Sequence, residues 1–404
     1  MSAAPRYAPE FRIAIDGAPA PAALRASVVS ASVQTGLEGV DRLELALANE
    51  NLRWLDHPLL RLDRQVAFSL GYAPDLPEQM FVGEIVSHQA AFPASGTPTL
   101  TVVAQDRRHR MQRGNRTRWF AISIPDYGNL PIPDNAVAAM VTSEHAMIPL
   151  ADPVAAALAV LLGGAQVAIA LDDPDAGQKV IRQQAGESDF DFLTRIAQEN
   201  GWEMLVDHGG ALGGRQLRFF SPADRLKPDL SLRWGRDLID FTPRLSNVGQ
   251  VASVSVPIWV PAMKTEFKVS VSWDWDRQSL DVSISPGFAM PAPGDADSGE
   301  EFTLLGQPVT LADAPRTILV ELLPRLNRRL TAAGSTVGDP RLRAGGVVAV
   351  EGVGEQFGGL YRVTSVTHSI DSGGWRSSFE ARKEIWFGSI PLPEQGAVPV
   401  RLTA

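Results

Sequence analysis

Apolar and polar residues alternate in short runs over two regions of the chain, one near each end. In the first region, from about residue 10 to residue 106, this period of two predicts strands, because successive side chains of a strand point to opposite faces of a sheet. Turn-forming Gly, Pro, Asp and Asn residues separate the runs. Six short strands at such spacing are typical of a sandwich or a small barrel. The expected strands are 11–15, 26–33, 43–47, 66–70, 81–86 and 100–103.

The second region begins near Leu230 and shows the same alternation. The glycine-rich stretch 352–358 lies between two of its strands, so we interpret it as a β-turn and not as a dinucleotide-binding loop. The strands expected in this region are 238–241, 251–256, 267–273, 347–350, 359–370 and 375–382.

A helical segment is expected to interrupt the second region. It follows the polar interval 288–301, Asp313 can cap its first turn, and Pro315 fits into that turn. Pro324 lies inside the apolar stripe and should kink the helix or split it in two. The residues of this stripe are Ile318, Leu319, Leu322, Leu326 and Leu330.

Between the two β regions the pattern is mixed. The clearest element is a helix over 188–200, where Ser188 can cap the first turn and Gly201 can end the last one. The runs 202–206 and 216–220 flank a glycine-rich turn and predict a β-hairpin. The apolar face of the helix consists of Phe190, Leu193, Ile196 and Ala197.

Ahead of that helix, the Pro-rich stretch 121–150 is expected to be loop-like. The uncharged stretch 153–171 has nearly the length of a membrane span. We do not interpret it as one, because it is mostly alanine, contains Gln166 and is divided by two adjacent glycines. A buried helix and a short strand are expected instead, at 152–162 and 165–171.

These patterns together predict a mainly β fold with an α+β insertion. The chain is expected to divide into a first β domain, an α+β domain with a connector, a second β domain and a Pro-rich tail. The boundaries are 1–112, 113–228, 229–390 with the helical insertion at about 302–334, and 391–404.

Composition excludes several kinds of function. The chain has 404 residues, enough for roughly two to three domains, with 45% hydrophobic and 21% charged residues. It has no cysteine, which excludes disulfides, thiolate metal sites and thiol nucleophiles. The 37 Lys and Arg against 46 Asp and Glu give a net charge of −9, which argues against a nucleic-acid surface. The first residues lack the pattern of a secretory signal, so we expect synthesis in the cytoplasm.

A search for chemistry yields no motif of a known active site. No stretch matches a phosphate-binding loop, a His-Glu-x-x-His zinc site or a Gly-x-Ser-x-Gly nucleophile elbow. The arginine-rich stretch 106–118 is interpreted as a solvated connector or an arm that faces a partner. The acidic stretch 295–301 lacks the ligand spacing of a calcium loop and is interpreted as a surface loop.

The titratable side chains do not form a local site either. Six histidines occur singly, so they could bind a metal only by long-range assembly, and His368 is expected to be a strand residue with a satisfied ring. Glu187, Asp189 and Asp191 could serve as an acid/base group, but their place at a helix N-terminus explains them without catalysis. We therefore name no catalytic, cofactor-binding or metal-ligating residue.

Three stretches, in this order, resemble a known family. The segment 186–202 contains Glu187-Ser-Asp-Phe-Asp-Phe-Leu-Thr-Arg195 and is similar to a segment of the bacteriophage late control gene D family, the tail hub of contractile phages. The same segment occurs in the hub part of type VI secretion spike proteins. Residues 232–251 resemble the entry to the second barrel of that family, and 334–345, 358–368 and 375–379 resemble its C-terminal barrel.

This resemblance implies a structural protein. Family hubs are homotrimers with two similar β-barrels in each subunit, so that three chains form a pseudo-six-fold ring between a hexameric tube and a trimeric spike. The expected partners are therefore two further copies of the chain, a trimeric spike, tail tube or tube-initiator proteins and other baseplate proteins. The expected location is a phage tail or a phage-derived particle that is assembled in the cytoplasm and can be released from the cell.

The sequence also departs from the spike proteins of type VI systems. It has no β-helical repeat after Phe387 and no lysozyme-like insert, so we expect a separate spike subunit, no enzymatic activity and no cofactor. We expect the tail 391–404 to add a strand to a neighbour through Val398, Val400 and Leu402. Two alternatives stay open. One is a carbohydrate-binding or peptidoglycan- or polysaccharide-degrading β protein, favoured by nine tryptophans and many carboxylates, and the other is a hub tethered to a membrane through 153–171.

Overall fold

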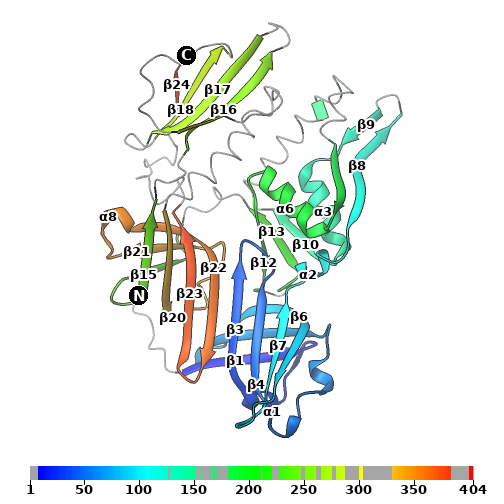
Figure 1. The fold of residues 1–404 in the computed structure, drawn as a ribbon, viewed down its shortest axis with the longest axis vertical. Coiled ribbons are helices and arrows are strands. Elements are labelled where there is room, and N and C mark those ends of the chain that lie inside the picture. The colour runs from blue at the N-terminus through cyan, green and yellow to red at the C-terminus, as the bar shows by residue number, and fades with distance from the viewer. Residues whose placement is uncertain are drawn as a thin grey trace.

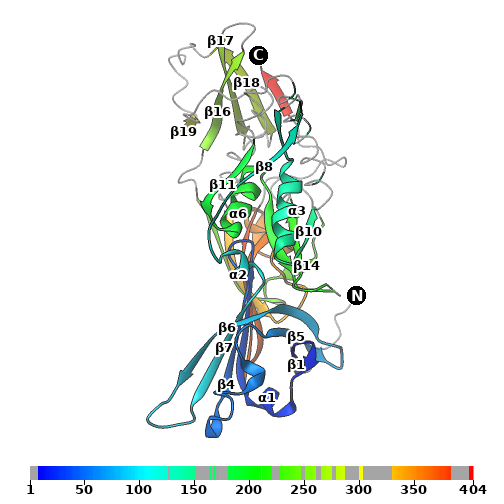
Figure 2. The ribbon, with the colours of Figure 1, turned by 90° about the vertical axis from the view of Figure 1, so that its right-hand side faces the viewer.

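The computed structural model shows a mainly β protein with a large, almost entirely antiparallel sheet and few helices (Figures 1 and 2). Besides one 13-stranded sheet, the described residues form two sheets of three strands and one of five. The residues described are 8–125, 128–151, 181–210, 212–220, 227–246, 251–260, 265–274, 279–286, 300–303, 330–383 and 400–403, with a few single positions between 156 and 171.

The first β region contributes six main strands to the large sheet, and all six predicted strands are confirmed with shifted ends. The strand predicted from residue 26 begins at Val28. The residues before it are rich in Ala and Leu and form helix α1 (Ala22–Ser27), which starts directly after Pro21. We call the six strands the first set: β1 (Ala8–Ile15), β3 (Val28–Gly36), β4 (Arg42–Ala48), β5 (Gln65–Ala73), β6 (Glu78–Ala91) and β7 (Thr99–Gln105). Short elements complete this region: β2 (Ala18–Pro19) and two 3-10 turns, η1 (Glu50–Leu52) and η2 (Pro58–Leu60).

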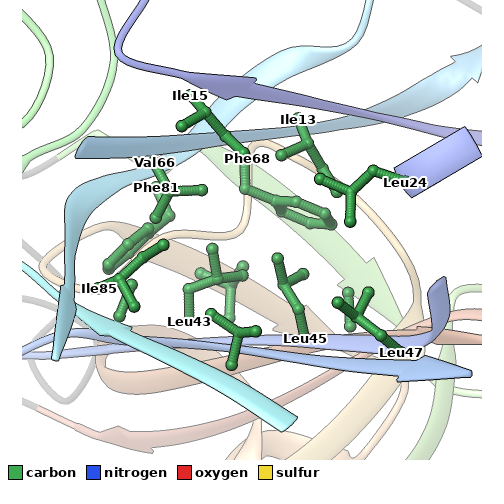
Figure 3. Packing of buried hydrophobic residues seen from close by; sticks show 14 of the residues in the cluster. Ile13, Ile15, Leu24, Leu43, Leu45, Leu47, Val66, Phe68, Phe81 and Ile85 are labelled. Atoms are coloured by element: carbon green, nitrogen blue, oxygen red, sulfur yellow. The ribbon is translucent and has the colours of Figure 1, made fainter. Parts of the chain in front are cut away.

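Figure 3 shows the core of the first set, where side chains from facing strands meet. Leu43 and Leu47 of β4 and Phe68 of β5 are fully buried, and each occupies an alternate position of its strand. The period of two seen in the sequence therefore corresponds to one face of each strand turned toward the core. Each fully buried side chain of this kind stabilises the fold by about 1.5–3 kcal/mol.

The second β region contributes six further strands to the same sheet. We call these the second set: β14 (Leu230–Arg233), β15 (Leu238–Leu245), β20 (Leu330–Val337), β21 (Val347–Glu351), β22 (Gly359–Asp371) and β23 (Gly374–Arg382). The predictions for β15, β21, β22 and β23 are confirmed. Between β21 and β22 the chain forms a single helical turn, α8 (Gly354–Phe357), and not the predicted β-turn.

Strand β20 corrects the predicted helical insertion, which extended to residue 334. Leu330 does not belong to a helical stripe, because it starts β20 and is buried in the sheet. The small residues of this strand give a weak strand signal in the sequence. They are needed because a Cβ on Gly334 would lie only 2.9 Å from the ring of Phe379 on the neighbouring strand. Residues 304–329, which carry the rest of the predicted helix, lie outside the described residues.

The two sets are joined edge to edge. Strand β22 pairs with β21 through Gly359–Arg362 and then with β3 through Ser365–Ile370, while β23 occupies its other side. Figure 1 shows β22, in orange, beside β3, in blue. Ile370 and Trp375 of the second set also belong to the core cluster of the first. Residues more than three hundred positions apart in the chain therefore form one continuous sheet.

Both sets have the same strand order. If the strands of each set are numbered one to six along the chain, the order across the sheet is 2-3-6-5-4-1 in the first set. It is also 2-3-6-5-4-1 in the second set, with β14 placed beside β21. One pairing differs, because β1 is antiparallel to β5 whereas β14 is parallel to β21.

Two small sheets and the helices α2, α3 and α6 are described in the part of the chain between the sets. Helix α6 (Asp189–Glu199) is confirmed, with Ser188 accepting a hydrogen bond from the Asp191 amide and Gly201 in the left-handed region behind it. The predicted hairpin is confirmed as well. The other elements are α2 (Arg108–Met111) and α3 (Asp134–Glu144), one sheet of β8 (Arg116–Ile124), β9 (Gly128–Pro131) and β11 (Arg182–Glu187), and one of β10 (Ile148–Ala151), β12 (Glu203–Asp207) and β13 (Gln216–Phe220).

Two expectations for this middle part are wrong. The stretch 121–150 is not loop-like, because it contains β9, α3 and β10. Helix α3 begins directly after Pro133, in keeping with the preference of proline for the start of a helix. In the predicted strand 165–171, the described positions Val167, Ala168 and Leu171 are helical, in keeping with the helix propensity of an alanine-rich run. Most of the predicted helix 152–162 lies outside the described residues. Among the described residues, no helix is long and apolar enough to span a membrane.

The remaining five-stranded sheet lies at one end of the molecule (Figure 1). It contains β16 (Val251–Val260), β17 (Thr265–Asp274), β18 (Ser279–Pro286), β19 (Glu300–Thr303) and β24 (Val400–Thr403). The C-terminal residues do add a strand to an edge, as expected, but the edge is that of β18 in the same chain and not that of a neighbour. Glu300 and Glu301 were expected to end the acidic surface loop 295–301. They belong to β19 instead.

Candidate functional site

A polar cavity of about 390 Å³ lies where the first set, the β12–β13 hairpin and the loop after β20 meet. Its lining includes Asp41, His208, Arg218 and Arg343, so both charge signs face it. The buried residues beside this cavity form the most concentrated polar cluster that the described chain brings together, and we therefore consider its chemistry first.

Arg108 is the centre of this cluster and is fully buried. Its guanidinium donates to the Asp106 carboxylate at 2.8 and 3.0 Å and lies 3.0 Å from the Asp41 carboxylate. Asp106 also accepts hydrogen bonds from the backbone amides of Arg108 and Asp41. The prediction that 106–118 is a solvated connector or partner-facing arm is therefore wrong at its start. Asp106 and Arg108 instead hold the first set against the middle part of the chain.

The arginines that follow are bound in the same way. Arg110 donates two hydrogen bonds of 2.7 Å to the buried Glu84 carboxylate on β6. Arg118 on β8 donates to Glu144 and Asp189, which belong to α3 and α6. The positive charges of this stretch are thus balanced by carboxylates from distant parts of the sequence, and no analysis of the local sequence could identify those partners.

His208 fastens the β12–β13 hairpin to this cluster. Its Nε2 lies 2.8 Å from the Asp41 carboxylate, and its Nδ1 accepts a hydrogen bond of 3.1 Å from the Val82 amide on β6. Because Nδ1 is an acceptor here, the proton of the ring is on Nε2, where it is donated to Asp41. The ring also stacks on Phe81, with 5.1 Å between the ring centres.

The environment keeps the Asp41 carboxylate charged. Burial raises its pKa, but the Arg108 guanidinium and the hydrogen bonds from His208 and the Gly36 amide outweigh this effect, so the pKa lies below its ordinary value. The pKa of Arg108 is raised: burial lowers it, and the Asp106 and Asp41 carboxylates more than compensate. The cluster therefore favours the charged forms of Asp41 and Arg108.

Asp41, Asp106 and His208 offer ligand atoms close enough together to hold a metal ion. The donor set does not fit that role, because the Arg108 guanidinium already occupies the cation position between the two carboxylates. The His208 nitrogen that faces them carries a proton, as argued above. We conclude that the cluster is a structural ion pair that ties three segments together.

A second buried cluster surrounds the N-terminus of α6. Asp189 is 3% exposed and binds Arg118 at 2.7 Å, Gln184 at 2.9 Å and His145 at 2.8 Å. Burial raises the pKa of Asp189. The hydrogen bonds and the nearby arginines lower it by more than burial raises it, so the pKa lies below its ordinary value. A carboxylate held charged by several donors and by a helix N-terminus is a poor proton donor, which agrees with the structural interpretation of this residue.

His368 behaves as the sequence predicted. Its ring is 1% exposed, with Nδ1 2.7 Å from the Ser377 hydroxyl and Nε2 3.0 Å from the Leu342 carbonyl. Burial lowers the pKa of His368 to about 4. The residue is therefore a satisfied core histidine in β22.

Large exposed apolar side chains occur on β8 and β15 and directly after β6. Trp119 and Ile122 on β8 are 63% and 52% exposed. Phe92, directly after β6, is 61% exposed, and Ile239 and Leu245 on β15 are 50% and 37% exposed. Single exposed apolar residues are common, but groups of them along strand edges indicate surfaces that contact other proteins.

Comparisons with known proteins give a consistent result for the fold. No protein-family model matches the sequence. No curated protein matches it either. Among solved structures, the 43 kDa tail protein of prophage MuSo2 from Shewanella oneidensis has a TM-score of 0.61 at 13% identity, over 94% of this chain and 100% of that one. A tail protein of Neisseria meningitidis has a TM-score of 0.60 at 9% identity, over 93% of this chain and 97% of its own length.

This is the fold of phage tail proteins. A third structure with this tail-protein fold is the Escherichia coli c3393 protein, described as a component of the type VI secretion system with structural similarity to the phage T4 tail proteins gp27 and gp5. Its TM-score is 0.56 at 13% identity, over 96% of this chain and 79% of that one. The resemblance to a phage tail family that the sequence indicated is thus confirmed at the level of the fold.

Proposed function

We propose that this protein is the structural hub of a contractile injection system, a phage tail or a phage-derived particle, and that it adapts a hexameric inner tube to a trimeric spike. The observation that carries the proposal is the likeness to the tail proteins of Shewanella oneidensis and Neisseria meningitidis, which extends over nearly the whole of each chain. A fold alone does not specify a function, but a likeness that covers nearly all of this chain supports a role of the same kind.

The strand sets favour a role in changing symmetry. Two sets with one strand order, joined in a single sheet, give each chain two equivalent building units. Three chains then supply six such units around one axis, which matches a six-fold tube on one face and a three-fold spike on the other. In this proposal each set, with its neighbours, forms one barrel of the hub, and the chain acts as a homotrimer.

The proposed role is non-enzymatic. The buried carboxylates of both polar clusters in the described chain are held by arginines and by backbone or amide donors, as in a structural framework. The proposed partners are the tube or tube-initiator proteins, the spike and other baseplate proteins, and the proposed site of assembly is the cytoplasm.

Native mass spectrometry of the purified full-length chain, alone and with the spike encoded beside its gene, tests this proposal. We expect a mass of three chains, and electron microscopy of the complex should show a ring with six similar lobes. A chain that stays monomeric under both conditions would contradict the proposal. Turnover of peptidoglycan that depends on a single carboxylate of this protein would favour the polysaccharide-degrading alternative instead.

A further inference from the structure

The two strand sets agree in more than their strand order. In β6 a β-bulge lies between Ile85 and Ser87, opposite β7, and in β22 a β-bulge lies between Val363 and Ser365, opposite β23. In β3 the register shifts between residues 28 and 30, and in β15 it shifts between residues 238 and 240. The second and fifth strands of both sets are therefore irregular at the same place.

Hydrogen bonds at the bulge of the fifth strand repeat as well. In each set, the residue that begins the bulge exchanges two backbone hydrogen bonds with the loop ahead of the fourth strand. Ile85 does so with Asp63 and Arg64, at 2.8 and 2.9 Å, and Val363 does so with Gly345 and Gly346, also at 2.8 and 2.9 Å. This agreement fixes a residue-by-residue correspondence, in which Ser87 of β6 matches Ser365 of β22, and Ala31 of β3 matches Phe241 of β15.

The contact between the sets inside one chain uses two of these strands. The second half of β22 pairs with β3 in antiparallel register, from Ser365 opposite Gly36 to Ile370 opposite Ala31. One face of this contact is apolar and buried, with His368 opposite the fully buried Val33. The other face is polar. In the correspondence above, the matching segments are residues 87–92, which are the last residues of β6 and the residue after it, and residues 241–245 of β15.

Those matching edges are open in the isolated chain. Strand β5 covers the outer side of β6 only up to Glu84, and residues 87–91 are exposed. Strand β15 pairs with β20 on one side and ends the path of the large sheet, with no described strand on its other side. Figure 2 shows β6 and β7 extending away from the rest of the first set. An open strand edge is a template for pairing with another chain.

We propose that the end of β6 in one copy pairs with β15 of the next copy, and so repeats between chains the contact that β22 and β3 make within one chain. The inference rests on the proposed trimeric hub and specifies its interface. Because two different edges meet, the contact is heterologous and joins copies head to tail, and it closes into a ring when the rotation between copies permits. Contacts within and between chains then alternate around the ring.

The side chains at the two edges suit this register. Transferring the β22–β3 pairing places Phe92 opposite Phe241 and Ala90 opposite Pro243 on one face, in keeping with the apolar face of the contact within the chain. On the other face it places Gln89 opposite Arg244, which is polar as well. Phe92 and Leu245, which are 61% and 37% exposed in the isolated chain, would both lie on the covered apolar face.

Pro243 adds a detail to the interface. In the contact within the chain, the matching residue Val33 faces β22 with its backbone polar groups, because the Leu37 amide, four residues further on, donates to the Thr364 carbonyl. Pro243 then turns its nitrogen to the open side of β15, where it removes no hydrogen bond to β20. The interface between chains has one donor fewer than the contact within the chain, and an edge proline limits pairing with wrong partners.

Paired cysteines test the register, since the chain has no cysteine of its own. Residues 89 and 244 would form a non-hydrogen-bonded pair with Cα atoms about 4.5 Å apart, which is within the range that a disulfide bridges. The double variant Gln89→Cys with Arg244→Cys should give linked dimers and trimers on oxidation, seen on a non-reducing gel and reversed by reductant. Each single variant should stay unlinked.

Two matched variants serve as controls. Gln34→Cys with Thr367→Cys, a directly opposite pair inside the chain, should form an internal disulfide and leave a monomer band. Gln89→Cys with Thr242→Cys shifts the register by two residues on the same face and should link much less. A trimer by native mass that fails to link through residues 89 and 244 would overturn the proposed interface and leave the hub proposal standing. A chain that neither links nor assembles would contradict both.

Discussion

The two strand sets share one framework but fill it differently. The first set closes its second-to-third strand connection within residues 37–41, whereas the second set has residues 246–329 in the corresponding place, including most of the five-stranded sheet. The first strand also runs in opposite directions in the two sets, antiparallel in β1 and parallel in β14. The bulges of the second and fifth strands, opposite the third and sixth, are nevertheless the same in both sets. The shared part is thus the sheet itself, and the connections at its edges can change without disturbing it.

The two sets also use the same local motif in different environments. Asp106 and Arg108 follow β7, and Asp339 and Arg341 follow β20, and in both the arginine folds back onto the carboxylate two residues earlier. Arg108 is fully buried and reaches Asp41 as well, whereas the side chain of Arg341 is 56% exposed. The same Asp-x-Arg spacing therefore makes a fully buried ion triad in one place and, in the other, an ion pair between an exposed arginine and a buried carboxylate.

The largest expected effect comes from replacing the arginine of each motif in turn and comparing the losses in stability. Arg108→Met leaves the carboxylates of Asp41 and Asp106 buried without their cation, and we expect a loss of about 3–5 kcal/mol in the free energy of unfolding. Arg341→Met, the matched control, removes a guanidinium that is 56% exposed and leaves the buried Asp339 carboxylate its hydrogen bond from the Arg341 backbone amide, so its loss should be clearly smaller than that of Arg108→Met. Denaturant unfolding of both variants measures the difference. Equal losses would show that the burial of Arg108 has no energetic consequence.

An effect of similar size is expected in the pH dependence of stability. It is specific to the fifth strand of the second set, because His368 of β22 corresponds to Ala90 of β6, which does not titrate. The pKa of His368 is about 4 in the folded protein because of burial, against an ordinary value of 6.5. The unfolded chain therefore binds more protons between pH 6.5 and pH 4, and the stability present above pH 6.5 falls as the pH drops to about 4. The loss expected from this residue is about 3 kcal/mol.

Unfolding curves of the wild type and His368→Gln at several pH values test this point. The variant should lose stability less steeply than the wild type between pH 6.5 and pH 4. Parallel pH profiles would mean that the His368 ring does not resist protonation in the folded state.

A smaller effect is expected at Gly83 of β6, which corresponds to Tyr361 of β22. The second set accommodates the fully buried Tyr361, whose hydroxyl donates to the Phe357 carbonyl at 2.6 Å. At Gly83 a Cβ would overlap the Gln105 carbonyl of the neighbouring strand. Gly83→Ala should therefore destabilise the protein by about 1–3 kcal/mol through overpacking.

The control for this substitution is Gly209→Ala, because a Cβ there would meet the Asp207 carboxylate at 3.4 Å and the Arg343 guanidinium at 4.0 Å, both ordinary contact distances. Thermal unfolding of the two variants gives the comparison. If Gly83→Ala proved as stable as the control, the close approach of β6 to β7 would be readily relaxed.

The smallest effect concerns assembly alone. Ala90 has the same place in β6 as His368 in β22, so its amide faces the open edge, and Ala90→Pro removes no hydrogen bond to β7. We expect unchanged folding by circular dichroism and weaker assembly, by about tenfold in the dissociation constant for the loss of one hydrogen bond. Ala90→Ser, which keeps the amide, is the control. Unaltered assembly of the proline variant, measured by analytical ultracentrifugation, would speak against pairing at this edge.

Much of the fold could be predicted from local patterns. Alternation located the six main strands of the first set and four strands of the second, because half-buried strands impose a period of two. The caps of α6 marked its ends because helix termini need partners for their free amides. The prediction was wrong where the local signal was weak or misleading. Strand β20 consists largely of small residues, and α3 follows a proline that marks either a break or a beginning.

The buried clusters could not have been predicted in this way. Asp41 and His208 are 167 positions apart, and their contact depends on the packing of the β12–β13 hairpin against the first set. The same holds for the arginine-rich stretch, because a run of charge indicates a solvated surface unless distant carboxylates are brought to it. Its partners Glu84, Glu144 and Asp189 lie on three separate elements.

The sequence by itself determined most strands of the two sets, the capped ends of α6 and the family that the chain resembles, because these depend on neighbouring residues along the chain. Only the tertiary structure decided that the two β regions form one sheet, that they repeat the same strand order and bulges, and that β6 and β15 keep open edges. These features depend on hydrogen bonds between segments far apart in the chain, and such pairings leave no periodic signal in the sequence.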